Sequence, residues 1–158
     1  MRNGLRRLHR FMRRLTALLA LLLLFLAGSA QAAEMKILVV IKGHNLPAVL
    51  EDNPASRLLY ELMPITVKMK NLYQREMSCT LPGKLPVSKL SANDCRAGDI
   101  IYMPHRQSLS IIYGKSSQRF RRQNLGHIAS GAELFKNLGE TDVTFAPFVE
   151  SDFPKPKQ

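Results

Sequence analysis

Short strand-like runs of apolar residues, separated by turn residues, occupy most of the chain after residue 34. In residues 65–70, the apolar Ile65, Val67 and Met69 alternate with polar residues, which is the pattern of a strand with one buried face. Other strand-like runs cover residues 35–41, 46–50, 73–81, 99–103, 109–113, 125–128 and 143–149. They lack the strand–helix–strand rhythm of a parallel sheet. The pattern therefore predicts a mainly β, antiparallel domain that closes into a barrel, because closure removes exposed strand edges.

The stretch from residue 98 to residue 114 carries the clearest hairpin pattern. Two runs of strand-forming residues, 99–103 and 109–113, flank the polar segment Pro-His-Arg-Gln-Ser. Two such runs joined by about five turn residues are typical of a β-hairpin. Alternation in the second run places Tyr113 on its apolar face and Ser110 on the opposite face.

Two short helices are predicted among the strands. Asn53 or Asp52 can cap the first helix, which begins with Pro54 at a position that suits proline. It has about two turns, so it needs an apolar surface of the sheet to pack on. The second helix is expected over residues 132–138, with Ser130 as its cap.

The first 32 residues have the composition of a secretory leader. Six arginines and no acidic residue precede a 13-residue apolar run, and Ala30-Gln31-Ala32 fits a cleavage site. The alternative is an uncleaved membrane anchor, for which about 20 apolar residues are needed. The sequence thus predicts a signal peptide over residues 1–32, a domain over 33–150 and a flexible tail over 151–158. The protein is expected in the periplasm or outside the cell.

Removal of the leader changes the charge. The whole chain carries +11, but 17 basic and 12 acidic residues remain after residue 32, a net charge of +5. The smaller charge and the export argue against nucleic acid as a partner and leave a mild preference for anions. A membrane is a partner only through an uncleaved leader, and the pattern leaves the oligomeric state open.

Cys79 and Cys95 both lie in the exported part, where a disulfide between them can form. Two buried thiols are the alternative, favoured for Cys79 by its place on an apolar strand face. Histidines 44, 105 and 127 are separated by 61 and 22 residues, which matches no compact metal motif. Nucleotide-binding and hydrolase motifs are also missing, so we expect neither a cofactor nor a metal.

Two groups of residues are candidates for ligand binding. Aromatic and basic residues of the 98–114 hairpin can line a pocket, and the arginines around Phe120 can hold a carboxylate or phosphate. The alternatives are ordinary packing for the tyrosines and solvation for the charged residues. The candidate ligand-binding residues are Tyr102, His105, Arg106, Tyr113, Arg119 and Arg121.

Five short motifs follow one another in a distinctive order. They are Leu50-Glu51-Asp52-Asn53-Pro54-Ala55, Leu62-Met63-Pro64, Gly98-Asp99-Ile100-x-Tyr102-x-Pro104, Ile111-Ile112-Tyr113-Gly114 and Leu125-Gly126-x-Ile128-x-Ser130-Gly131. In this order the chain resembles the small bacterial cyclophilin-like proteins, a family of mostly undefined activity, over about residues 35–149. The resemblance implies a cyclophilin-like β-barrel closed by two short helices.

The resemblance does not imply the activity of true cyclophilins. Their catalytic pattern includes a Phe-His-Arg run, which is missing here, and the chain has no tryptophan. His105-Arg106-Gln107 looks similar but falls in the expected hairpin turn, so no catalytic role is carried over to it. We therefore expect an exported, non-catalytic binding module for a small anionic ligand or a peptide. The alternative is a peptidyl-prolyl cis-trans isomerase.

Overall fold

The computed structural model describes residues 34–115 and 119–149 of the protein. The predicted signal peptide and the predicted tail lie outside the described residues. Within the described ranges, no helix has the length and apolarity needed to cross a membrane.

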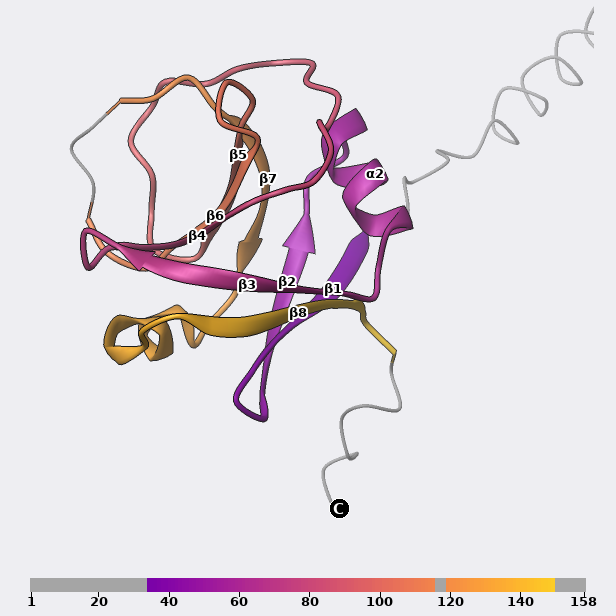
Figure 1. Ribbon diagram of the computed structural model, residues 1–158. Coiled ribbons are helices and arrows are strands. Elements are labelled where there is room, and N and C mark those ends of the chain that lie inside the picture. Colours follow the sequence, from indigo (N-terminus) through magenta and orange to yellow (C-terminus); the bar gives the residue numbers. More distant parts are fainter. Residues whose placement is uncertain (1–33, 116–118, 150–158) are drawn as a thin grey trace, which may run out of the picture. The chain divides into compact units, whose positions relative to one another are not determined.

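The described chain forms a closed, antiparallel barrel of eight strands with two short helices (Figure 1), as the sequence predicts. The strand order around the barrel is β1-β2-β7-β5-β6-β4-β3-β8. In chain order the elements are β1 (Met35–Ile41), β2 (His44–Leu50), α2 (Pro54–Glu61), β3 (Ile65–Leu72), β4 (Glu76–Thr80), β5 (Asp99–Met103), β6 (Ser108–Ile112), β7 (Gln123–Ile128), the 3-10 helix η1 (Ala132–Asn137) and β8 (Thr141–Pro147).

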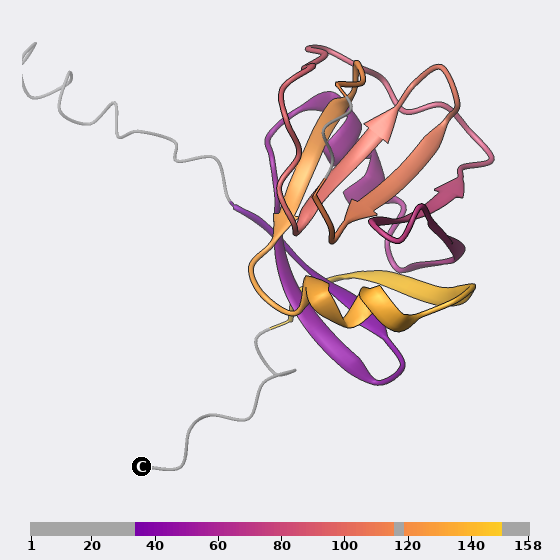
Figure 2. The same cartoon turned by 90° about the vertical axis from the view of Figure 1, so that its left-hand side faces the viewer.

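Alternate side chains of the strands fill the barrel. Met69 of β3, Leu109 and Ile111 of β6, and Phe145 of β8 are all fully buried in one apolar cluster. Each large apolar side chain that leaves water in this way stabilises the fold by about 1.5–3 kcal/mol. The tip of the β1–β2 hairpin extends beyond the other strands (Figure 2).

The 98–114 hairpin forms as predicted. β5 and β6 pair from Ile100 opposite Ile111 to Met103 opposite Ser108, with a turn between them. Gly98, just before β5, has a φ of +98°. A Cβ atom there would lie 2.7 Å from the carbonyl oxygen of Ile128, so both the backbone conformation and the close packing require glycine.

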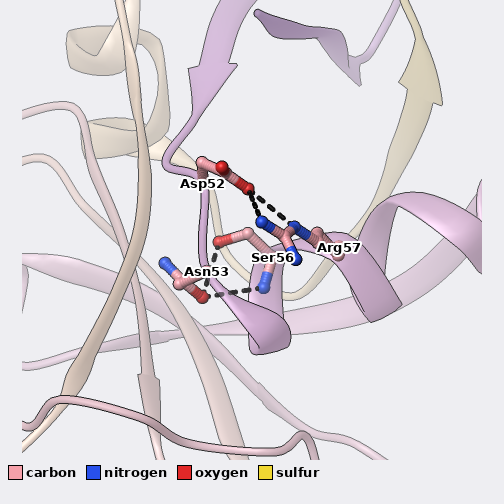
Figure 3. A network of polar contacts seen from close by, with 4 residues as sticks. All are labelled: Asp52, Asn53, Ser56 and Arg57. Carbon is pink, nitrogen blue, oxygen red and sulfur yellow. Dashed lines mark hydrogen bonds and ion pairs between the residues drawn. The ribbon is translucent and has the colours of Figure 1, made fainter. Parts of the chain in front are cut away.

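Asn53, one of the two predicted caps, caps the start of α2 (Figure 3). The Asn53 side-chain oxygen accepts a hydrogen bond from the Ser56 amide at 3.0 Å, and its Nδ2 donates to the Asn124 carbonyl at 2.9 Å. The Ser56 hydroxyl lies 2.9 Å from the carbonyl oxygen of Leu125. The helix start is therefore tied to β7. Figure 3 also shows Asp52, the alternative cap, which forms an exposed ion pair with Arg57.

Several element ends differ from the sequence prediction. β4 begins at Glu76 rather than at residue 73, because Tyr73 and Gln74 adopt positive φ in the turn after β3. The second helix is a 3-10 helix preceded by Gly131 in the left-handed conformation, and no side chain caps it, so Ser130 does not play that role. The last strand is shifted to Thr141–Pro147.

Candidate functional site

The two candidate tyrosines face the barrel interior. Tyr102 is fully buried, and its hydroxyl accepts a hydrogen bond from the Leu85 amide at 3.2 Å. Tyr113 is 8% exposed, and its hydroxyl donates to the side-chain oxygen of Asn71 at 2.6 Å. Both belong to the core cluster. The hydroxyl groups of both tyrosines are therefore used in hydrogen bonds to neighbouring segments of the domain.

The four charged candidates lie on the surface and are divided between separate regions. His105 and Arg106 are exposed in the β5–β6 turn. Arg119 forms an exposed ion pair with Asp94 at 3.4 Å, and Arg121 is exposed nearby in sequence. Arg106 lines a cleft together with Lys68 and Lys70 of β3.

Beside that cleft, β3 and β4 are paired over only part of their lengths. β3 pairs with β8 from Ile65 to Met69, but it pairs with β4 only over Lys70–Leu72. β4 continues to Thr80 alongside β6. The term β3–β4 gap is used below for the unpaired space between residues 65–69 of β3 and residues 79–85, together with the adjoining surface over the paired residues Lys70 and Ser78. Figure 1 shows the first residues of β3 beside α2.

One part of the gap is apolar. It encloses about 470 Å³ beside Ile65 and Val67, and α2 forms one of its walls. Leu62, at the end of α2, is 52% exposed. Its lining consists of Leu58, Leu59, Leu62, Ile65, Thr66, Val67, Leu81, Pro82, Gly83, Lys84 and Leu85.

The other part is basic. It encloses about 310 Å³ and is lined by Lys68, Lys70, Leu72, Ser78, Cys79, Thr80, Arg106 and Ser108. The hydroxyl oxygens of Ser78 and Ser108 lie 2.7 Å apart on its floor. Ser110 donates to Ser78 at 2.9 Å, so these hydroxyls form a connected group.

The cations of this part are weakly paired. Lys70 lies 3.6 Å from Glu140, and Lys68 lies 3.9 Å from Glu140 and 4.0 Å from Asp142, all with exposed side chains. Exposed pairs of this kind contribute about 0–1 kcal/mol. Among the described residues, no carboxylate lies within ion-pair distance of Arg106. An anion can therefore compete for these cations.

Glu76 on β4 is an acidic residue that interacts electrostatically with Arg106. Burial raises the pKa of its carboxyl above the usual 4.5, and the positive charges of Arg75 and Arg106 oppose that rise. The thiol of Cys79 also lines the basic part, but burial raises its pKa to about 11. Because the thiolate is the reactive form, Cys79 is a poor nucleophile near neutral pH. The arrangement is suited to binding and supplies no activated thiol.

Cys79 and Cys95 are free thiols in the structure. The two residues have different surroundings. Cys95 lies close to the buried Arg122, whose charge opposes the rise in the thiol pKa that burial causes.

A third cleft, of about 410 Å³, lies at the start of α2 and is polar. Two of its side chains serve the fold. Asn53 caps α2, and the Gln123 side-chain oxygen accepts hydrogen bonds from the amides of Ser88 and Lys89, both at 3.1 Å. The described ranges contain no group of three His, Cys, Asp or Glu residues able to hold a metal ion.

Sequence reasoning missed Lys68 and Lys70 as site residues. Alternation does place them on the outer face of β3, which is normally a solvated face. Their meeting with Arg106 depends on the antiparallel order β6-β4-β3, which joins segments that are far apart in the chain. The pattern of apolar and polar residues along the chain does not indicate this order of strands in the sheet.

Comparisons with known proteins agree with the barrel. A model of the family described as the cyclophilin-like family matches residues 39–146. The solution structure of a hypothetical protein from Archaeoglobus fulgidus is similar, with a TM-score of 0.58 at 15% sequence identity. The similarity covers 76% of this chain and 99% of that chain, and it concerns the fold alone. No curated protein matches the sequence.

Proposed function

The chain belongs to the cyclophilin-like family, and we propose that it is an exported, non-catalytic module that binds an anionic ligand in the basic part of the β3–β4 gap. The observation that carries the proposal is that Lys68, Lys70 and Arg106 converge on one small cleft. Two lysines of β3 and one arginine of the β5–β6 turn line this cleft together with the hydroxyl-bearing residues Ser78, Thr80 and Ser108.

The chemistry of these groups suits carboxylates and phosphates. Arg106 can donate two parallel hydrogen bonds to such a group, and the lysines add point charges. The hydroxyls of Thr80 and Ser108 provide further donors or acceptors at the floor. Export is supported by the leader-like pattern of residues 1–32, and the +5 charge that remains afterwards favours an anion.

The proposal is tested by measuring the melting temperature, Tm, of the protein as purified from cells, with inorganic phosphate and with a small dicarboxylate. A ligand that binds only the folded state stabilises it by about 2.7 kcal/mol at about 100 times its Kd. We expect a rise in Tm for the wild type, a clearly smaller rise for Arg106→Ala and Lys68→Ala, and a decline of the effect with added salt.

The matched control is the double variant Arg119→Ala/Arg121→Ala, which removes two exposed arginines from the other candidate region. It should retain the full rise in Tm. Absence of any rise in the wild type would contradict the proposal. If the rise in Tm is lost in the double variant and kept in Arg106→Ala, the anion binds at the loop around Phe120. The assignment to the β3–β4 gap is then wrong.

A further inference from the structure

β3 has a free edge beside the gap. From Ile65 to Met69 it is hydrogen-bonded to β8 on one side, and its register with β4 starts only at Lys70. In an antiparallel strand, successive residues direct their N–H and C=O groups alternately to the two sides. Every second residue of this segment therefore directs them toward the gap. The described part of the chain provides no strand to meet them.

The free edge lies along the apolar part of the gap. Ile65 and Val67 line that part on one wall, and residues 81–85 line the opposite wall. Five strand residues extend about 17 Å, and a neighbouring strand lies about 4.8 Å away. The volume of about 470 Å³ provides room for the inward side chains of a short extended segment.

The two faces of β3 differ in character at this edge. Val67 is half-buried against the core, whereas Thr66 and Lys68 are exposed on the outer face. A strand added here would present alternate side chains to these two environments. The inner ones would enter the apolar part, and the outer ones would lie beside Lys68, Lys70 and Arg106.

We propose that the β3–β4 gap binds an extended segment of a partner protein as an added strand, with apolar residues at every second position and acidic residues between them. This inference rests on the proposed function, since the acidic side chains would use the same cations. Main-chain hydrogen bonds give affinity in this mode of recognition, and the side-chain pockets give specificity.

Charge complementarity identifies the partner segment as acidic. Lys84 lies at the rim of the apolar part, and Lys68, Lys70 and Arg106 line the adjoining basic part. The ion pairs of the two β3 lysines with Glu140 are long and exposed, so an incoming Glu or Asp can replace them. A small anion alone would leave the apolar part and the free edge unused.

The inference is tested by fluorescence anisotropy of a labelled Val-Glu-Val-Glu-Val peptide mixed with the protein as purified from cells. Two further peptides separate the contributions: Val-Lys-Val-Lys-Val reverses the charge, and a version methylated at alternate backbone nitrogens removes main-chain donors. We expect binding of the first peptide, and a loss of affinity of about tenfold or more for the other two.

Variants of the protein locate the binding. Lys68→Glu places like charges opposite each other and should weaken binding about tenfold, and Leu62→Glu should weaken it similarly by adding a charge to the apolar part. Lys136→Glu and Leu134→Glu are matched controls, because they alter an exposed lysine and an exposed leucine of η1. Both controls should bind like the wild type. New amide-exchange protection at alternate residues of 65–69 should accompany binding.

The outcomes distinguish the two proposals. If phosphate raises the Tm in an Arg106-dependent way but no alternating peptide binds, the added-strand inference is wrong and the anion site stands. Binding that tolerates backbone methylation, or that ignores Lys68→Glu, also overturns the inference. If neither phosphate nor peptide binds, the proposed function itself is wrong.

Discussion

At the scale of single residues, the hydrogen bonds of some part-buried polar side chains explain their positions. The side-chain oxygen of Asn71 accepts from Tyr113, and its Nδ2 donates to the Leu138 carbonyl at 2.7 Å. One amide thus joins β3, the segment after β6 and the end of η1. From the sequence, Tyr113 is a candidate for ligand binding. The strand pattern places it on the apolar face but does not show that its hydroxyl is bonded to Asn71.

Tyr113→Phe should destabilise the fold without altering anion binding. The substitution leaves the part-buried side-chain oxygen of Asn71 without its 2.6 Å donor. A buried acceptor left unpaired costs about 1–3 kcal/mol, so we expect a loss near the lower end of that range for this part-buried oxygen. Urea unfolding measures the loss. Tyr73→Phe is the matched control, because Tyr73 is 72% exposed, and it should be close to neutral. Equal stability of both variants would show that the Tyr113 hydroxyl contributes nothing.

Cys79 should make the stability depend on pH in the alkaline range. Burial raises its pKa from 9.0 to about 11 in the folded state, so between these pH values the unfolded chain loses the thiol proton first. The folded state then binds more protons, and the stability that this thiol contributes is constant below pH 9 and falls as the pH rises toward 11. Unfolding free energies of the wild type should therefore drop more steeply there than those of Cys79→Ala. If the unfolding free energies of the wild type and Cys79→Ala changed in parallel between pH 9 and pH 11, the prediction would be wrong.

At the scale of elements, alternation and turn chemistry predict the strands and the pairing within the 98–114 hairpin, but not the pairing of strands that are distant in the chain. Residues 65–70 alternate cleanly, and β3 has the predicted inward residues. The β1–β2 turn, in contrast, is limited to Lys42-Gly43, because His44 already pairs with Ile41. The β3–β4 gap could not be foreseen, since it depends on where the register of two strands ends. That register is set by tertiary packing around the whole barrel.

α2 should depend on its cap. It has eight residues, too few for a stable isolated helix. Asn53→Ala removes the acceptor for the Ser56 amide and the donor to the Asn124 carbonyl, so we expect a loss of about 1–3 kcal/mol in urea unfolding. Asn53→Asp keeps the cap acceptor and loses the donor. Its free energy of unfolding should therefore lie between those of the wild type and Asn53→Ala. Asn45→Ala, at an exposed strand position, is the control. If Asn53→Ala matched that control, the cap would not anchor the helix.

At the scale of the whole molecule, composition and motif order predicted the barrel more fully than the site. The fold follows from many weak signals that agree, such as short alternating strands and five motifs in order. The site depends on a few exposed cations brought together by topology, and exposed cations occur all over this basic chain. Arg106 was among the candidates, and its two lysine neighbours on β3 were not.

Processing after Ala32 is expected, because a 13-residue apolar run followed by Ala30-Gln31-Ala32 is typical of a cleaved leader. N-terminal sequencing of the protein recovered from the cell envelope measures it directly. The expected first residue is Ala33. A chain that still starts at Met1 and is released only by detergent would support the membrane anchor instead.

The protein should accelerate X-Pro isomerisation little or not at all, although its fold is that of the cyclophilin-like family. A shared fold does not transfer an activity, which depends on the site. The His105-Arg106-Gln107 segment lies in the exposed β5–β6 turn, and the residues that line the apolar part of the adjacent gap include no aromatic side chain. Uncatalysed isomerisation takes tens to hundreds of seconds, so a proline-peptide assay has ample range. We expect the uncatalysed rate for the wild type and for Arg106→Ala alike. Strong catalysis by the wild type that Arg106→Ala abolishes would instead make the β3–β4 gap an active site, and would replace the binding function proposed for it.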